Sequence, residues 1–355
     1  MLAAAMLERP RRNRVSKWIR ALARETELSA DHLVWPVFVQ EGPDSESPIL
    51  SMPGISRYGI RKLVERVKDA FALGVPAVAL FPKIDDSLKD PRGSAGTEPN
   101  NLLCMATRAL KEALPELVVI TDVALDPYSS DGHDGVVIEG RIDNDVTLPI
   151  LAEMAVVQAR AGADIVAPSD MMDGRVQCIR EALDSEGFTQ VGICSYAVKY
   201  ASAFYGPFRD ALDSAPRGGD KKTYQMNPAN VREAVREAQL DVREGADWLM
   251  VKPGLPYLDV IRAVREATQL PIAAYHVSGE FSMLKAAAER GMLDYDACLL
   301  ESLLCMRRAG ADIIFTYGAV DAARGLRATA RSEIRVPKLC TGTGAALIPV
   351  SVTVQ

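Results

Sequence analysis

The chain has 355 residues, of which 48% are hydrophobic, and a formal net charge of −6. A chain of this length and apolar content can bury a large core, and α/β barrels often exceed ~250 residues in one domain. The acidic balance excludes a general basic surface for nucleic acid. No apolar run reaches the ~18 uncharged residues that a membrane span needs, so we expect no membrane partner.

The N-terminal segment is basic, and the cysteines are scattered along the chain. We interpret the run RPRRNR at 9–14 as a subunit contact or a solvated arm. The opening MLAAAMLERPRR carries its charges after a short apolar patch, which is the reverse of a secretory signal. The six cysteines form no C-x-x-C motif and are typical of reduced thiols. We therefore expect a cytoplasmic protein.

Eight apolar segments with the composition of buried strands follow along the chain, and amphipathic segments at helical spacing lie between them. Strands that alternate with helices predict an α/β fold, a (β/α)8 TIM barrel. An open doubly wound sheet is the alternative, although no G-x-G-x-x-G follows an early strand. The predicted strands are 34–39, 76–81, 117–125, 164–169, 191–197, 247–252, 271–277 and 312–317.

A repeated pattern supports the barrel. The stretches at 160–170, 243–254 and 308–318 each contain a helix end, a turn with glycine, an aspartate and an apolar strand that ends in a polar residue. Glycine at such a turn is typical of a left-handed helix C-cap. The chemistry of a barrel of this kind lies at the carboxyl ends of its strands.

Lys199 and Lys252 lie at two of these strand ends, after VGICSYAV and DWLMV. A lysine in a strand mouth loses hydration, which lowers the pKa of its amine, and a second cation nearby lowers it further. Such an amine can attack a ketone as a Schiff-base nucleophile. The alternative is structural, with both stems reaching solvent or a buried carboxylate.

A long segment, at 200–230, leaves the fifth predicted strand. Its aromatic residues, glycines and prolines, together with Arg209, Lys221 and Lys222, are typical of a lid that carries cations. Fixed positive charge favours an anionic substrate, and a guanidinium binds a carboxylate in a fork. A surface loop with ordinary basic residues is the alternative.

A series of motifs occurs in one order between about residues 7 and 328: TDVALDP, APSDMMDGR, YAVKYASAFYGPFRDA, TYQMNPAN, MVKPGLPYLD, YHVSGE and LLCMRRAGADIIFTY. These motifs closely resemble the delta-aminolevulinic acid dehydratase family, also called porphobilinogen synthases. The resemblance implies a lyase that condenses two 5-aminolevulinate molecules, with loss of two waters, to porphobilinogen for tetrapyrrole (haem) biosynthesis. It also implies a homo-octamer. We expect an N-terminal arm over 1–30 that clasps a neighbour, a catalytic barrel over 31–330, and a tail over 331–355 without an assigned role.

The resemblance also implies roles for single residues. Lys252 matches the principal Schiff-base lysine, and Lys199 matches the second catalytic lysine. Arg209 and Lys221 match the cations that hold one substrate carboxylate, and the adjacent Lys222 is an alternative to Lys221. Ser278 and Tyr317 match the residues that hold the other carboxylate.

Two further residues are singled out by their positions in the sequence rather than by the resemblance. Asp122 and Ser169 lie at the ends of the third and fourth predicted strands. There they can relay protons or orient an amine. Capping of the strand ends is the alternative reading for both.

The metal prediction rests on a departure from part of the family. Zinc-dependent members carry three cysteines where this chain has Ala124, Asp126 and Asp134, so we expect no zinc-cysteine site. Asp126 and Asp134 could attract Mg²⁺ or a monovalent cation such as K⁺. Glu237 matches an allosteric Mg²⁺ ligand of magnesium-responsive members, and a solvated helix glutamate is the alternative. His133 with Asp131 has poor spacing for zinc.

Two rival functions remain. A class I aldolase also forms an imine on a barrel lysine, but it needs one such lysine and often a phosphate site. A non-catalytic ligand-binding or assembly barrel would form no imine.

Overall fold

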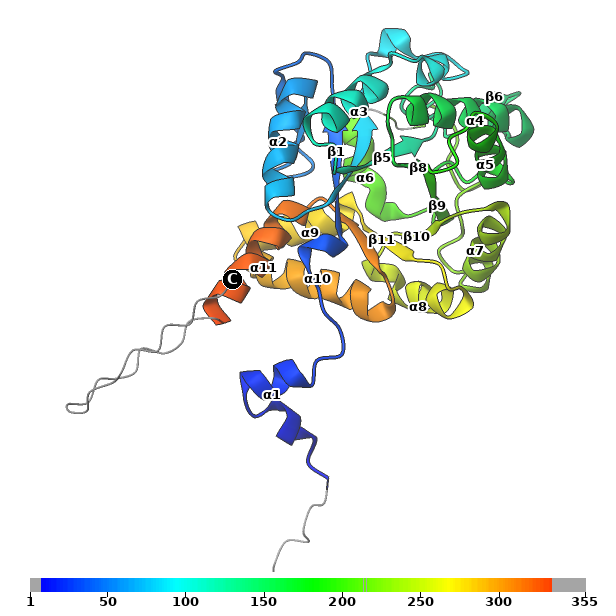
Figure 1. Cartoon of the computed structure of the whole chain (residues 1–355). Coiled ribbons are helices and arrows are strands. Elements are labelled where there is room, and N and C mark those ends of the chain that lie inside the picture. Colours follow the sequence, from blue (N-terminus) through cyan, green and yellow to red (C-terminus); the bar gives the residue numbers. More distant parts are fainter. Residues whose placement is uncertain (1–7, 213, 215, 334–355) are drawn as a thin grey trace, which may run out of the picture.

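Eight parallel strands close into a barrel in the computed structural model, which describes residues 8–212, 214 and 216–333 (Figure 1). Pairing between the first and last of these strands closes the barrel and joins Leu33 to Ile314. This confirms the predicted (β/α)8 architecture. The barrel strands are β1 (Leu33–Val39), β4 (Ala77–Pro82), β5 (Val118–Val123), β8 (Ile165–Pro168), β9 (Gly192–Lys199), β10 (Trp248–Lys252), β11 (Ile272–His276) and β12 (Ile313–Thr316).

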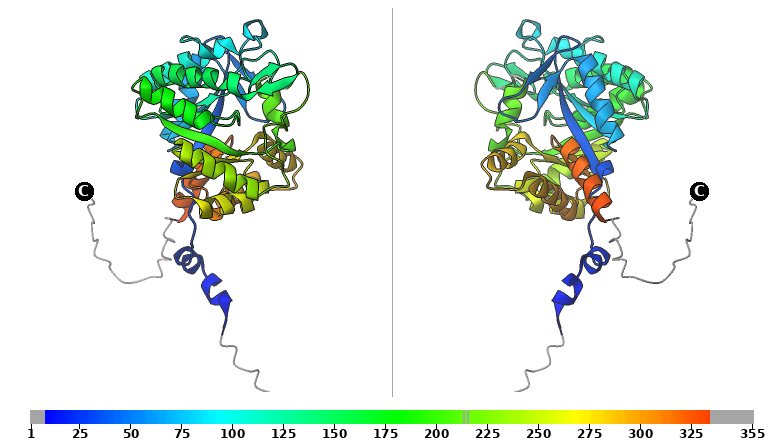
Figure 2. Two further views of the ribbon diagram at one scale, coloured as in Figure 1. Left: turned by 90° about the vertical axis from the view of Figure 1, so that its right-hand side faces the viewer. Right: turned by 90° about the vertical axis from the view of Figure 1, so that its left-hand side faces the viewer.

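Helices surround the barrel and cover the outer face of its strands (Figures 1 and 2). Glycines such as Gly245 and Gly310, with φ of 101° and 126°, end two of them in a conformation that other residues rarely adopt. The helices of the barrel are α2 (Ile60–Ala72), α3 (Leu102–Ala113), α4 (Asn144–Arg160), α5 (Arg175–Ser185), α7 (Arg232–Glu244), α8 (Leu258–Ala267), α9 (Ser278–Glu289), α10 (Tyr295–Ala309) and α11 (Ala319–Glu333).

The strands are buried on both faces because they separate two cores. The inner core fills the barrel and is rich in aromatic residues, among them Phe38, Phe81 and Tyr275. The outer core lies between strands and helices and contains aliphatic side chains such as Val37 and Leu80. Each strand contributes to both cores, since successive side chains point to opposite faces.

The segment at 200–230, called the lid below, contains the short helices η5 (Ala203–Tyr205) and α6 (Gly206–Leu212). Two hairpins that the sequence did not predict lie outside the barrel: β2 (Glu46–Pro48) pairs with β3 (Ser56–Tyr58), and β6 (Val136–Ile138) pairs with β7 (Arg141–Asp143).

The N-terminal segment leaves the barrel as a separate extension (Figures 1 and 2). It contains η1 (Pro10–Arg14) and α1 (Lys17–Leu22), and neither has a buried residue. The tail expected over 331–355 lies outside the described residues except at 331–333, where α11 ends. Among the described residues, no helix is long and apolar enough to cross a membrane.

Candidate active site

Lys199 and Lys252 are paired across β9 and β10, each at the last position of its strand. The Nζ atoms of Lys199 and Lys252 lie 6.0 Å and 5.0 Å from the ring centroid of the same residue, Tyr196. Both side chains are buried at the carboxyl end of the barrel. The structure therefore brings together the two lysines that the sequence singled out.

An irregularity in β9 makes this arrangement possible. Ser195 pairs with Leu249 and Val198 pairs with Val251, so three steps along β9 match two along β10. Such a bulge interrupts the strict alternation of side chains. Tyr196 consequently lies in the inner core, the successive residues Ala197 and Val198 both pack in the outer core, and Lys199 returns to the inner face.

Aromatic rings enclose the amine of Lys252. Its Nζ lies 4.5 Å from the ring centroid of Tyr275, 5.1 Å from that of Phe208 and 5.3 Å from that of Tyr205. Burial, and then the charge of Lys199, lower the pKa of Lys252 to about 7. A substantial fraction of this amine is therefore neutral and nucleophilic near neutral pH.

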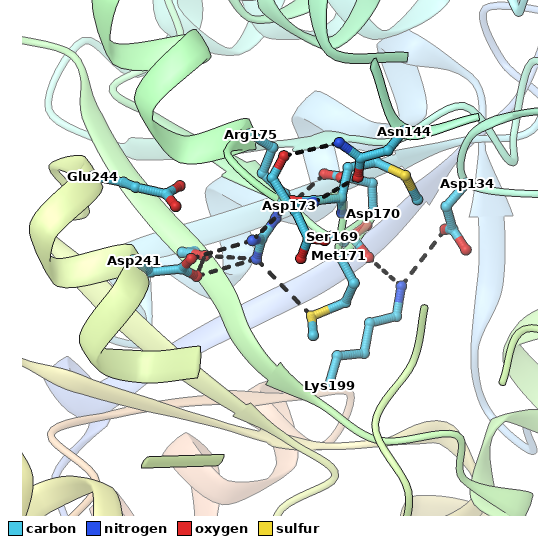
Figure 3. A network of polar contacts seen from close by, with 12 residues as sticks. Asp134, Asn144, Ser169, Asp170, Met171, Asp173, Arg175, Lys199, Asp241 and Glu244 are labelled. Carbon is cyan, nitrogen blue, oxygen red and sulfur yellow. Dashed lines mark hydrogen bonds and ion pairs between the residues drawn. The ribbon is translucent and has the colours of Figure 1, made fainter. Parts of the chain in front are cut away.

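Lys199 lies in a polar setting, with Ser169 and Asp134 beside its amine (Figure 3). Its ammonium group donates a hydrogen bond to the backbone carbonyl of Ser169 and lies 3.6 Å from Asp134 Oδ1. Lys221 of the lid reaches the same carboxylate, with 2.9 Å between its Nζ and Asp134 Oδ2, and lies 3.4 Å from Asp126 Oδ2. Lys222, in contrast, is exposed and pairs with Asp220. Lys221 rather than Lys222 thus faces the site.

The three buried aspartates of the site have different acidities. Burial, and then the neighbouring Asp126, raise the pKa of Asp122 to about 7 against a hydrogen bond from Ser169. Burial also raises the pKa of Asp126, although Lys221 opposes the shift. Burial acts against ionisation of Asp134 too, but Lys199 and Lys221 hold the pKa of that carboxyl below its usual range. Asp122 can thus exchange protons near neutral pH, whereas Asp134 remains a fixed anion.

The other expected substrate-binding residues lie around the Lys252 end of the site. Ser278 begins α9, and its hydroxyl accepts a hydrogen bond of 3.0 Å from the backbone N–H of Phe208 in the lid. The hydroxyl of Tyr317 lies 3.1 Å from that of Tyr275, beside Lys252. Arg209 is half-buried on α6 of the lid.

A buried network behind Lys199 was missed by the sequence reasoning (Figure 3). Arg175 donates to both carboxylate oxygens of Asp241 on α7, at 3.2 and 3.1 Å, and to Ser195 Oγ at 3.0 Å. It lies 3.7 Å from Asp170, whose carboxylate accepts the N–H of Met172. The DMMDGR motif was the available signal, because a basic residue that closely follows two acidic ones beside a strand end predicts such a network.

Glu237 lies apart from the two lysines. It lines a cavity of about 1150 Å³ between the lid, the β6–β7 hairpin and α7, together with Asp173 and Glu233. Burial, and then Asp241, raise the pKa of Glu237. The polar lining suits a hydrated hard cation, because Mg²⁺ keeps several of its waters. No group of three His, Cys, Asp or Glu side chains in the described part of the chain could hold a metal ion directly.

Asp126 and Asp134 offer a poorer metal site in this structure. The ammonium groups of Lys221 and Lys199 already contact these carboxylates. A metal bound directly to the pair would have to displace an ammonium group. The sequence-based prediction of Mg²⁺ or K⁺ on the two aspartates thus stays a prediction that the observed ion pairs disfavour.

The closed barrel, with reactive amines and titratable carboxyls at the carboxyl ends of its strands, defines a TIM-barrel enzyme. Residues 7–325 match the family model described as delta-aminolevulinic acid dehydratase. The chain belongs to the delta-aminolevulinic acid dehydratase family.

Individual relatives agree with this assignment. The chain is 58% identical to the chloroplastic delta-aminolevulinic acid dehydratase of Glycine max over 320 residues, which are 90% of this chain and 77% of that protein. Its identity to the Bradyrhizobium diazoefficiens enzyme is 53%, covering 90% of this chain and 91% of that one. The solved structure of the Toxoplasma gondii enzyme in complex with porphobilinogen matches with a TM-score of 0.91 and 52% identity, covering 95% of this chain and 96% of that one.

Proposed function

We propose that Lys252 and Lys199 each bind one 5-aminolevulinate molecule as a Schiff base and thereby carry the porphobilinogen synthase reaction of this chain. The activity itself follows from the family and from the product-bound relative. The observation that carries the proposal is the pairing of the two buried amines over one ring, Tyr196. An iminium acidifies the neighbouring carbon and makes its own carbon electrophilic, as a condensation of two ketones requires.

The overall reaction balances when each of the two lysine amines forms one imine. Each amine adds to one ketone and releases one water, which accounts for the two waters lost. The amino group of one substrate then displaces one lysine to form the ring C–N bond, and formation of the C–C bond followed by elimination releases the other. Asp122 is suited to move protons in these steps because its pKa lies near 7. The hydroxyl of Ser169 hydrogen-bonds to Asp122, and its backbone carbonyl accepts a hydrogen bond from the Lys199 ammonium group.

Substrate orientation follows from the remaining groups. Arg209 and Lys221, both on the lid, supply the cations for one carboxylate. Ser278 and Tyr317 supply hydroxyl groups for the other. Lys221 is the better candidate than Lys222, because Lys221 is buried against Asp134 and Lys222 is exposed.

The test is borohydride trapping with 5-aminolevulinate, followed by intact-mass and peptide analysis. The wild type is expected to gain adducts on Lys252 and Lys199, and Lys252→Met is expected to lose both its adduct at 252 and pyrrole formation. Lys222→Met, which removes an exposed lid lysine, is the matched control and should behave as wild type. Pyrrole formation that persists in Lys252→Met would contradict the role of this lysine, and turnover that persists in Lys199→Met would favour a single-lysine, aldolase-like mechanism.

We also propose that Mg²⁺ acts at Glu237 as an allosteric ion rather than through a zinc-cysteine site. The polar cavity and the carboxylates around Glu237 support this placement. When bound, the ion supplies positive charge beside α7, and no catalytic step passes through it.

Assembly as a homo-octamer is proposed because the N-terminal segment exposes Trp18 and Leu22, which a neighbouring copy could cover. Light scattering tests this, and a mass of one chain would overturn it. A cytoplasmic location stays a prediction, since the plant relatives are named chloroplastic.

A further inference from the structure

The first turn of α9 joins the lid to the loop that follows Lys252. The hydroxyl of Ser278 accepts a hydrogen bond from the backbone N–H of Phe208, and it lies 3.5 Å from the carbonyl of Phe204. Gly279 lies so close to the lid that an added Cβ would meet the carbonyl oxygen of Phe204 at 2.5 Å. Only glycine permits this approach of two backbones. The lid and the start of α9 therefore share a close backbone contact.

Glu280, the next residue, extends the connection to the Lys252 side. One carboxylate oxygen accepts the backbone N–H of Leu255, three residues beyond Lys252, at 2.6 Å. The other accepts the N–H of Val277, immediately before Ser278, also at 2.6 Å. A single side chain thus fixes the distance between the loop after the Schiff-base lysine and the residue expected to hold a substrate carboxylate.

We propose that Glu280 is a positioning residue for the condensation, holding the loop after Lys252 in register with Ser278 and the lid. The inference rests on the proposed function, because it assumes the roles of Lys252 and Ser278. The Glu280 carboxylate hydrogen-bonds to backbone N–H groups rather than to the Lys252 amine. It acts through the two backbone segments that it joins.

Helix capping alone does not account for this carboxylate. A glutamate at the third helical position commonly accepts the N–H at the N-cap, and the Val277 bond is of this kind. Capping needs no burial, yet Glu280 is fully buried, and no ion pair to it occurs among the described residues. Burial raises the pKa of Glu280 to about 7 against its backbone hydrogen bonds. Burial of a carboxylate without a cationic partner is costly, and this buried carboxylate is the group that hydrogen-bonds to Leu255.

The variant Glu280→Asp distinguishes helix capping from the proposed positioning role. Glu280→Asp keeps a carboxylate in the first helical turn, where it favours the helix, but it is one methylene shorter and cannot span both segments. The experiment uses the full chain and measures the rate of borohydride trapping of 5-aminolevulinate on Lys252, kcat, KM and the melting temperature. Glu289→Asp makes the same change at an exposed position of α9 and is the matched control.

We expect Glu280→Asp to slow trapping on Lys252 and to lower kcat by about tenfold or more, because small misplacements of reacting groups are costly. The melting temperature and the behaviour of Glu289→Asp should stay near wild type. Trapping at the wild-type rate in Glu280→Asp would overturn the inference. So would failure of this variant to fold, since the carboxylate would then serve folding. Absence of a Lys252 adduct in the wild type would instead refute the proposed function.

Discussion

Lys199 and Lys252 are neighbours in register, and the charge of one lowers the pKa of the other. Burial contributes most to the low pKa of Lys252, and Lys199 adds to it as a like charge. The second lysine therefore acts on the first as well as offering its own amine. This coupling gives the first prediction.

Replacing Lys199 with Met should raise the pKa of Lys252, because a cation that disfavours protonation is removed. The fraction of neutral amine at a given pH then falls, so the pH at which trapping on Lys252 reaches half its maximal rate should move upward from about 7. The pH dependence of borohydride trapping measures this shift. Lys222→Met, distant from the pair, should leave the midpoint unchanged, and an unchanged midpoint in Lys199→Met would argue against the coupling.

Replacing Asp122 with Asn should lower turnover by about 10²- to 10⁴-fold, the usual range for loss of a general acid or base. The same variant should gain stability relative to wild type as the pH rises. The folded-state pKa of Asp122 is raised to about 7 from 3.8, so the wild type loses stability as pH rises between these values. The melting temperature of the Asn variant relative to wild type should therefore increase from pH 4 to pH 7. A difference that is independent of pH in this window would contradict the assigned pKa.

Replacing Lys221 with Met should destabilise the fold by about 3–5 kcal/mol, because two buried carboxylates lose their shared partner. Chemical denaturation measures the loss. Adding Asp134→Asn to Lys221→Met should restore part of the stability, since one uncompensated charge is removed. The same Lys→Met change at the exposed Lys222 should cost little, and equal losses at 221 and 222 would speak against this pairing.

Replacing Glu237 with Gln should abolish the response to Mg²⁺. We expect Mg²⁺ to raise the melting temperature of chelator-treated wild type, as any ligand of the native state does. The Gln variant should show no such rise. Glu244→Gln, on the same helix but outside the lining of the cavity, should respond as wild type. A full response in Glu237→Gln would place the ion elsewhere.

Much of the fold and part of the site could be predicted from the sequence for physical reasons. Buried parallel strands appear as apolar runs, and each predicted run ends within two residues of the corresponding barrel strand, which placed Lys199 and Lys252 at one rim. The cation-bearing lid was apparent from its length and composition. The ammonium contacts of Asp134 could not be predicted, because Asp134, Lys199 and Lys221 lie far apart in the sequence and come from the loop before β6, from β9 and from the lid.

The same limit applies to Arg175, Tyr196 and Glu280. Each of these residues acts through contacts between elements that are distant in the sequence, and a local hydrophobic pattern does not predict such contacts. The contact between Tyr196 and Lys199 in particular depends on the β9 bulge, because regular alternation would place these two residues on opposite faces.

The bulge in β9 also limits how this strand can evolve. Without the bulge, a regular strand of the same length would place Tyr196 and Lys199 on opposite faces, and the Lys199 amine would point outward toward the helices. Small apolar exchanges at 197 and 198 would leave the amine where it is. In this part of the chain, the irregular backbone path is therefore under stronger constraint than the chemical identity of the residues that form it.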